Sequence, residues 1–178
     1  MELLKATKYL IGLGHKRIAF VGQRKPKYDV RCRIEGFRDT MTKFFGSINE
    51  SFVVYCERPD RAGGYKAANS MILEAKIPTA IIACSDVIAL GIAECFREHG
   101  FRIPHDVSLI GFDDIEYASL PGINLTTICE PRYEIGKIAA EILMDIFNSK
   151  NKNKSRQIIL DPQLVVRKTC IKLPEHLQ

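Results

Sequence analysis

The sequence lacks the features that mark several classes of protein. No apolar run reaches the roughly 18–20 residues that a membrane span requires. The start of the chain has no basic segment followed by an apolar one, so we expect no secretory signal. The G-x-S-x-G, P-loop and H-E-x-x-H motifs are absent, and no histidine lies beside a candidate nucleophile. We therefore predict a cytoplasmic protein that is neither an enzyme nor a membrane protein.

Patterns typical of metal sites and disulfides are missing as well. The four histidines are scattered without the spacing of metal ligands, and none of the six cysteines belongs to a C-x-x-C pair. Cys56, Cys84 and Cys129 lie in apolar, strand-like runs, which is typical of reduced, buried thiols in a cytosolic protein. We therefore expect no metal and no cofactor. The net charge of +5 permits anionic ligands but falls short of the clustered basic surface of a nucleic-acid-binding domain.

The sequence does contain an alternation of short apolar runs and segments of helical periodicity. With 178 residues, 46% of them hydrophobic, one compact domain is the simplest expectation. Strands are predicted at 17–22, 52–55, 79–84, 107–111, 125–128, 157–160 and 164–167, and helices at 2–13, 30–45, 60–75, 85–100 and 133–148. The alternation predicts an α/β fold with a doubly wound, mainly parallel sheet.

Two carboxylates stand at the end of the stretch Ile103–Asp114, which runs from a proline turn through a buried strand. In a parallel sheet the carboxyl ends of the strands gather at the edge where ligands bind. Asp113 is the strongest candidate for a ligand contact, because a carboxylate accepts several hydrogen bonds. The alternative is that an acid here caps the following turn, which we favour for Asp114. The pair also permits a Mg²⁺ site, with Asp86 as the one obvious further acid.

Seven stretches match a known family in their order and spacing. They are Leu10–Phe20, Arg33–Phe37, Pro78–Ile82, Ser85–Gly91, Ile103–Asp114, Leu125–Ile128 and Leu164–Arg167. Each is weak alone, but as a set they span nearly the whole chain, which resembles the effector-binding core domain of the LacI/GalR family of bacterial transcription regulators. The resemblance implies a fold like that of the type I periplasmic binding proteins and a small polar effector, with a sugar as the expected class.

The resemblance also divides the chain into parts. It implies a helix remaining from the N-terminal lobe (1–15), the effector-binding C-terminal lobe (16–128), a helix and strand remaining from the N-terminal lobe (129–162), and a return strand with a tail (163–178). The family's DNA-binding headpiece matches no part of this sequence, so operator DNA is expected as a partner only through that headpiece. A homodimer is implied through helices near Tyr65–Glu74 and Ala89–His99 and the loop near Ala118–Leu120.

The family's binding residues carry over to several positions. The resemblance implies that Asp113 hydrogen-bonds the effector and that Arg33, in an R-x-x-G-F motif, contacts it from the opposite side. Ser85 and Asp86 stand where the family usually has Asn-Asp, which implies that a different group of the effector is recognised. The alternative for Arg33 is a surface ion pair with a neighbouring acid. The alternative for Asp86 is an acid at a helix N-terminus, stabilised by the macrodipole.

Asp29 and Arg132 complete the implied site. Asp29 lies one turn before Arg33, where relatives often have a small hydroxyl residue, and Arg132 lies at the crossover between the lobes. The alternative for Arg132 is a solvated crossover residue. Many relatives have an aromatic ring before the second helix that stacks on the effector, but here that place is near Pro59. Gly36, one turn after Arg33, is predicted to allow close helix packing.

Three functions follow from these patterns. The first is the effector-sensing domain of a LacI/GalR-type regulator, with repression as the expected activity. The second is a periplasmic sugar-binding transport protein of the same fold, which the six cysteines and the family motifs argue against. The third is a Mg²⁺-dependent phosphoryl-transfer enzyme.

One amphipathic helix is expected to lack its usual partner. In the family, the stripe from Ile135 to Phe147 packs on a sheet of the first lobe that this chain does not contain. We expect the stripe to pack against a partner chain or against the helix Leu3–Ile11, because exposed apolar stripes favour association. We also expect weak effector binding, since half of the cleft is absent.

Overall fold

The computed structural model describes residues 2–148 and 157–174. Six strands form one sheet in the order β2-β1-β3-β4-β5-β6. β1 pairs in parallel with β2 and β3, β3 with β4, and β4 with β5, whereas β6 is antiparallel to β5. The predicted doubly wound, mainly parallel α/β fold is confirmed.

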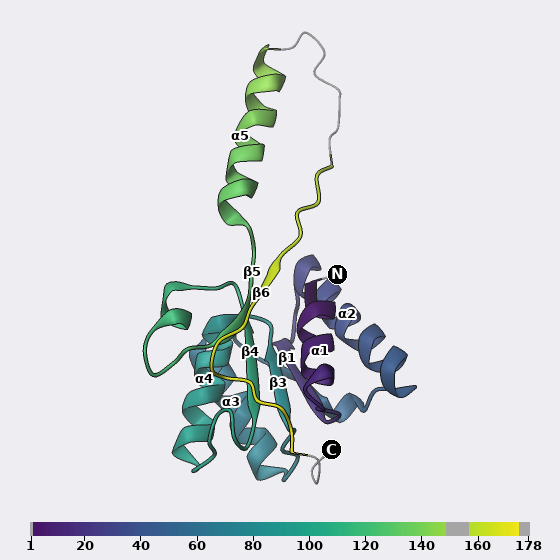
Figure 1. Ribbon diagram of the computed structural model, residues 1–178, viewed down its shortest axis with the longest axis vertical. Helices are drawn as coiled ribbons and strands as arrows, with labels where there is room; N and C mark the ends of the chain where they lie inside the picture. Colours follow the sequence, from purple (N-terminus) through teal and green to yellow (C-terminus); the bar gives the residue numbers. More distant parts are fainter. Residues whose placement is uncertain (1, 149–156, 175–178) are drawn as a thin grey trace.

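The elements follow one another with short connections. The strands are β1 (Ile18–Gln23), β2 (Val53–Cys56), β3 (Ala80–Ala83), β4 (Ser108–Phe112), β5 (Thr126–Cys129) and β6 (Gln163–Val165). The helices are α1 (Glu2–Gly12), α2 (Tyr28–Phe45), α3 (Arg61–Leu73), α4 (Asp86–Glu98) and α5 (Arg132–Asn148), with 3₁₀ turns η1 (Glu50–Phe52) and η2 (Glu116–Ser119). Figure 1 shows α1 and α2 on one side of the sheet and α3 and α4 on the other.

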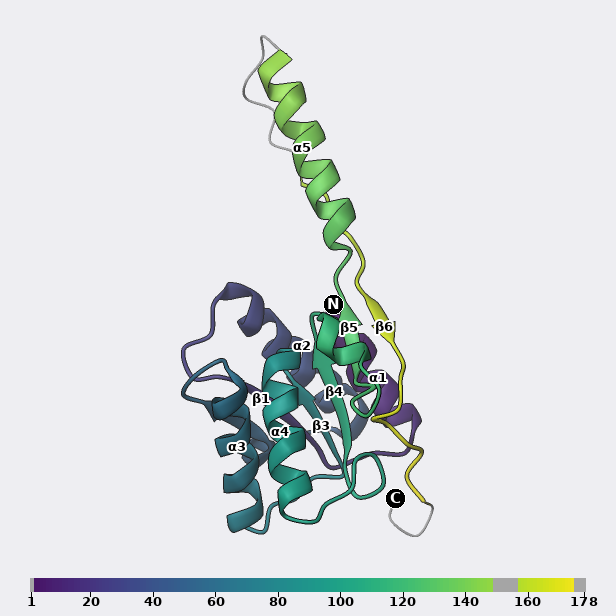
Figure 2. The same cartoon turned by 90° about the vertical axis from the view of Figure 1, so that its left-hand side faces the viewer.

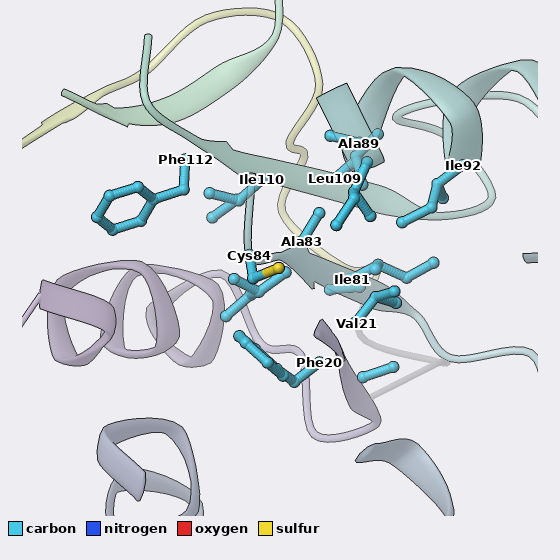
Figure 3. Packing of buried hydrophobic residues seen from close by; sticks show 14 of the residues in the cluster. Phe20, Val21, Ile81, Ala83, Cys84, Ala89, Ile92, Leu109, Ile110 and Phe112 are labelled. Atoms are coloured by element: carbon cyan, nitrogen blue, oxygen red, sulfur yellow. The ribbon is translucent and has the colours of Figure 1, made fainter. Parts of the chain in front are cut away.

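The central strands β3 and β4 lie in the core of the molecule. Every residue of β3 and β4 is buried, and strands covered on both faces are expected to be continuous apolar runs, as these are apart from Ser108. Figure 3 shows Leu109 of β4 beside Ala89 and Ile92 of α4, and all three side chains are fully buried. Burial of a large side chain of this kind contributes roughly 1.5–3 kcal/mol to stability. This packing holds the carboxyl edge of the sheet in place.

Helices α3 and α4 both begin at side-chain caps. The Asp60 carboxylate accepts a hydrogen bond from the Gly63 amide at 2.8 Å, and the Ser85 hydroxyl accepts one from the Ile88 amide at 3.4 Å. Each cap satisfies an amide that the first helical turn leaves without a partner. Because only Cys84 separates β3 from the cap residue Ser85, the N-terminus of α4 lies at the carboxyl edge of the sheet.

The backbones of α3 and α4 approach each other closely at Gly91. A Cβ atom there would lie 1.9 Å from the Arg61 carbonyl oxygen. We expect Gly91→Ala to lower the free energy of unfolding by about 1–3 kcal/mol, because backbone cannot move aside as a flexible side chain can. Urea denaturation measures the loss.

Gly36→Ala is the matched control for this prediction. Gly36 also lies inside a helix, but no heavy atom outside its own helix backbone and chain neighbours would lie within 4 Å of the added Cβ, so its predicted role in close packing is wrong. This control is expected to gain roughly 0.4–1 kcal/mol. Equal losses for the two variants would contradict the close approach at Gly91.

Helix α1 belongs to the main core. Ala6, Thr7 and Leu10 are fully buried, and α1 packs against α2 and against strands β3 and β5. His15, just after the helix, is also buried, with its Nε2 atom 3.0 Å from the Ile171 carbonyl oxygen. In this chain α1 therefore packs on the same core as the elements that follow it. The assignment of 1–15 to a first lobe in a longer protein stays a prediction.

Helix α5 stands away from the rest of the fold. Figures 1 and 2 show it projecting from the sheet, and none of its residues is buried. Tyr133 and Phe147 are each 80% exposed, and Leu143 is 54% exposed. The expected packing of the stripe against the Leu3–Ile11 helix is therefore wrong, because α1 uses its apolar side chains against α2 and the sheet. The alternative, a partner chain, stays a prediction.

Residues 157–160 do not form the strand that their apolar pattern predicts. Ile158 and Ile159 are 52% and 72% exposed, and a shallow groove of about 380 Å³ lies between residues 158–162 and α5. A strand needs a neighbouring strand to accept its backbone hydrogen bonds, and the described part of the chain offers none here. The second predicted strand, 164–167, is confirmed in substance as β6. The loop predicted at 149–156 lies outside the described residues.

Candidate functional site

A cleft of about 720 Å³ opens at the carboxyl edge of the sheet. It is lined by Gln23, Tyr28, Asp29, Val30, Cys32, Arg33, Cys84, Ser85, Asp113, Glu130, Ile159, Leu160 and Pro162. Strand ends β1, β3, β4 and β5 and the start of α2 all contribute, as expected for a ligand site in an open parallel sheet. Four of the six predicted binding residues line this cleft: Asp29, Arg33, Ser85 and Asp113. Asp86 and Arg132 do not.

Arg33 is the most firmly held side chain of the cleft. It is 8% exposed, and its guanidinium carbon lies 3.4 Å from the centroid of the Phe112 ring. Nη1 donates to the Cys84 carbonyl oxygen at 3.0 Å, and Nη2 donates to Oε1 of Glu130 at 3.1 Å. The ion pair with Asp29, part of the alternative role for Arg33, is present at 4.0 Å between Nη2 and Oδ2, but Arg33 is buried rather than at the surface. Stacking on an aromatic ring and fixed hydrogen bonds leave the guanidinium preorganised toward the cleft.

Asp113 presents its carboxylate from a turn with unusual backbone geometry. Its φ angle is 114° and that of Asp114 is 50°, a region that few residues other than glycine adopt. The amide of Asp113 donates to the Ile128 carbonyl oxygen at 2.9 Å, which anchors the turn to β5. Burial raises the pKa of Asp113, while the nearby Arg33 and Arg132 guanidinium groups lower it. A half-buried carboxylate next to two arginines is suited to accept hydrogen bonds from a polar ligand.

Arg132 reaches the same turn from the root of α5. Its Nη2 atom donates to the Asp113 carbonyl oxygen at 2.7 Å and lies 3.7 Å from Oδ1 of the same residue. The side chain is 55% exposed and does not line the cleft itself. Arg132 therefore ties the start of α5 to the turn that carries Asp113.

Asp86 lies beneath the cleft. It is fully buried, its Oδ1 accepts from the Thr127 hydroxyl at 2.6 Å, and its Oδ2 accepts from the Ile115 amide at 2.9 Å. Burial raises the pKa of Asp86 to about 6. In contrast to our expectation of a ligand contact, Asp86 links the Ile115 amide, two residues after Asp113, to Thr127 of β5.

Asp114 points away from the cleft toward the last strand. Its Oδ1 accepts a hydrogen bond from Nη2 of Arg167 at 2.7 Å, and both side chains are about one-fifth exposed. Nη1 of Arg167 in turn donates to the Leu125 carbonyl oxygen. Asp114 therefore has a structural role, as favoured for it, but as an ion pair rather than a turn cap. The described residues contain no cluster of three or more histidine, cysteine or acidic side chains placed to hold a metal ion.

Glu130 is the main cleft residue that the sequence reasoning missed. Its carboxylate accepts a hydrogen bond from Arg33. Glu130 follows β5 directly, so the rule that ligand sites lie at strand ends could have predicted it, as it predicted Asp113. Tyr28, Cys32 and Cys84 also line the cleft. Tyr28 provides an aromatic ring at the start of α2, although the expected place for such a ring was near Pro59.

A second cavity, of about 820 Å³, lies beside α4 toward the amino ends of β4 and β5. Its lining includes Ala89, Leu90 and Ala93 of α4, together with Ile123 and Leu125. None of the six predicted binding residues reaches it. Its α4 side belongs instead to the surface implied for a homodimer.

Comparison with known proteins identifies the family. Residues 7–170 match the description "Periplasmic binding protein-like domain". This chain belongs to that family. The domain shares 34% identity over 168 residues with the ribose operon repressor of Haemophilus influenzae, which covers 94% of this chain and 50% of the repressor. The chain thus spans about half the length of the curated relatives that it matches.

Two solved structures extend the comparison. A LacI family transcriptional regulator from Enterococcus faecium with bound ribose gives a TM-score of 0.86 at 27% identity, covering 97% of this domain and 63% of that chain. The lac repressor dimer bound to operator and an anti-inducer also gives 0.86, at 25% identity, covering 96% and 58%. The resemblance to LacI/GalR regulators is confirmed. Among residues 2–148 and 157–174, no helix has both the length and the apolar character needed to cross a membrane.

Proposed function

We propose that this domain senses a small polar effector of the sugar class for a LacI/GalR-type transcriptional repressor. The observation that carries the proposal is the convergence of Arg33 and Asp113 in one cleft at the carboxyl edge of the sheet. A fixed guanidinium donates hydrogen bonds and a carboxylate accepts several, so the two suit neighbouring hydroxyl groups. The ribose in the similar Enterococcus structure supports the same class of ligand.

In this proposal the cleft is one wall of a two-walled site. The other wall belongs to a second lobe outside this chain. The headpiece that binds operator DNA in the cytoplasm also lies outside this chain. Glu130 and Arg132 lie where the chain leaves the cleft for α5, so an effector that contacts both walls shifts the arrangement of the lobes. A coupling free energy of about 1–3 kcal/mol between effector and DNA is typical of such regulators.

The rival functions receive less support. The relatives are transcriptional repressors rather than transport proteins or enzymes. A Mg²⁺ site would require Asp113, Asp114 and Asp86 to converge. Asp114 instead pairs with Arg167, and Asp86 accepts hydrogen bonds from Thr127 and Ile115. A calorimetric titration of the domain with Mg²⁺ is therefore expected to give no binding heat.

A thermal-shift screen of uncharged sugars against the full-length protein tests the proposed function. A ligand present at 100 times its dissociation constant adds about 2.7 kcal/mol to stability. At least one pentose or hexose is therefore expected to raise the melting temperature by several degrees. A panel that leaves the melting temperature unchanged would argue against a sugar effector.

The homodimer is proposed to form through α3, α4 and the loop that contains η2. Leu73, Tyr117 and Leu120 expose 77%, 60% and 41% of their surface on these elements, which is costly for a lone protomer. Leu120→Glu is expected to shift the full-length protein from dimer to monomer in analytical ultracentrifugation. Phe44→Glu is the control and should leave the dimer intact, because Phe44 lies on α2 and is similarly exposed, at 48%. A dimer that survives Leu120→Glu would locate the interface elsewhere.

We propose that the exposed apolar stripe of α5 packs against a second copy of the 178-residue chain. We expect light scattering after size exclusion to give a mass above that of the monomer, rising with concentration, because the stripe buries apolar surface on association. Because the proposed dimer surface of α3 and α4 is also present in this chain, the test is made in the Leu120→Glu background, where Leu143→Glu should restore the monomer. Glu141→Gln, on the same helix, should not. A clean monomer for the unaltered chain would contradict this prediction.

A further inference from the structure

The charges around the cleft are unbalanced. Its lining contains three carboxylates, Asp29, Asp113 and Glu130, but a single guanidinium, that of Arg33. Arg132 approaches Asp113 from outside the lining. Glu130 and Asp29 both raise the pKa of Asp113, although burial has the larger effect, so these acids are close enough to influence one another. A ligand with a negative charge would therefore be repelled by these carboxylates.

Of the three carboxylates, Glu130 forms the shortest ion pair with Arg33. Its Oε1 atom lies 3.1 Å from Nη2, whereas Oδ2 of Asp29 lies at 4.0 Å. Nη1 donates to the Cys84 carbonyl oxygen, and the face of the guanidinium lies on Phe112. The Nη2 edge is thus the part of Arg33 with which an anionic ligand would pair, and the protein's own carboxylate occupies it.

We propose that Glu130 is a specificity-determining residue of the cleft, which neutralises Arg33 from within the protein and so selects uncharged polyols over phosphorylated or acidic ones. The proposal rests on the proposed function, because it concerns the same site and names the class of effector more narrowly. An anionic ligand must displace Glu130 from Arg33 and leave that carboxylate without its partner in a partly buried site. An uncharged polyol donates hydrogen bonds from its hydroxyl groups to the carboxylates of Glu130 and Asp113 and leaves the ion pair between Glu130 and Arg33 intact.

Binding of inorganic phosphate tests this role without knowledge of the effector. In the full-length protein, Glu130→Gln removes the competing charge while keeping the size of the side chain. We expect this variant to bind phosphate at least tenfold more tightly than the unaltered protein, as measured by isothermal titration calorimetry at constant ionic strength. Glu130→Ala provides a second variant with the same expected direction, should the glutamine variant fail to fold.

Glu50→Gln is the matched control. Glu50 forms an ion pair with Arg38 at 2.7 Å on the outer surface, so this change removes the same charge and also releases an arginine, but outside the cleft. We expect phosphate affinity to stay within twofold of that of the unaltered protein. Equal phosphate binding by Glu130→Gln and the unaltered protein, or an equal gain in Glu50→Gln, would overturn the proposal. A failed sugar screen, in contrast, would count against the proposed function and not against the phosphate result.

Discussion

Asp113→Asn is expected to weaken binding of the sugar effector by about 10- to 100-fold. Hydrogen bonds to a charged group contribute roughly 1.5–3 kcal/mol, and about 1.4 kcal/mol corresponds to a tenfold change in affinity. An asparagine amide also presents a donor where the carboxylate presents only acceptors, so part of the ligand's hydroxyl pattern is left without a partner. Isothermal titration calorimetry of the full-length protein with a sugar found in the thermal-shift screen measures the loss.

Asp106→Asn is the control for this prediction. Asp106 also pairs with an arginine, Arg102, but on an exposed loop away from the cleft, so its replacement should leave the affinity unchanged. The pH dependence provides a second check, because burial raises the pKa of Asp113 above its ordinary value. Affinity is expected to fall as the pH is lowered through that raised pKa, since the protonated acid accepts fewer hydrogen bonds. Equal losses in the two variants would show that Asp113 does not act at the ligand.

Asp86 is expected to make stability depend on pH in an unusual direction. Its pKa is about 6 in the folded protein against an ordinary value of 3.8, so in this range folding takes up a proton. The free energy of unfolding therefore rises as the pH falls from 7 toward 4. Asp86 adds nothing more once the pH is below its pKa in the unfolded chain. A difference of about 2 between the pKa values of Asp86 in the folded and unfolded protein corresponds to a contribution on the order of 3 kcal/mol.

Comparison with Asp86→Asn isolates this contribution. The asparagine does not titrate, so the unaltered protein should gain stability relative to the variant as urea denaturation is repeated from pH 7 to pH 5. Burial lowers the pKa of His15, which makes acidification destabilising, but this effect is present in both proteins and cancels in the difference. Parallel pH profiles for the two proteins would contradict the buried, proton-binding role of Asp86.

Asp86→Ala tests the link that Asp86 forms between Ile115 and Thr127. Alanine removes both oxygens, which now accept hydrogen bonds from the Thr127 hydroxyl and the Ile115 amide. The turn that carries Asp113 should then be held less firmly, and the affinity for the effector should fall even though residue 86 does not line the cleft.

Much of the fold follows from local pattern. Strands buried on both faces are continuous apolar runs, so β1, β3 and β4 could be predicted from composition alone, and glycines or prolines bound the helices between them. Asp113 could be placed at the site because it follows a strand at the carboxyl edge, which is a general rule of sheet topology. Arg33 lies inside α2, and its place in the same site is predicted only through the resemblance to the LacI/GalR family.

What the sequence could not predict depends on contacts between distant segments. Asp86 has the pattern of a ligand-facing acid, yet Thr127 and Ile115, 41 and 29 positions away, turn it inward. Residues 157–160 have a strand's composition, but the described part of the chain places no strand beside them. Glu130 resembles an ordinary polar residue after a strand until Arg33 is found 3.1 Å away. In each case the partner, rather than the residue itself, decides the role.

Mapping ligand-induced changes in chemical shift by ¹⁵N NMR tests the central claim most directly, because the cavity beside α4 is similar in volume to the cleft of Arg33 and Asp113. Titration with the uncharged sugar that gives the largest thermal shift should perturb amides at 28–33, 84–85, 113–115 and 130. That result would establish the cleft of Arg33 and Asp113 as the effector site. Perturbations confined to 89–97 and 122–125, which line the cavity beside α4, would contradict it.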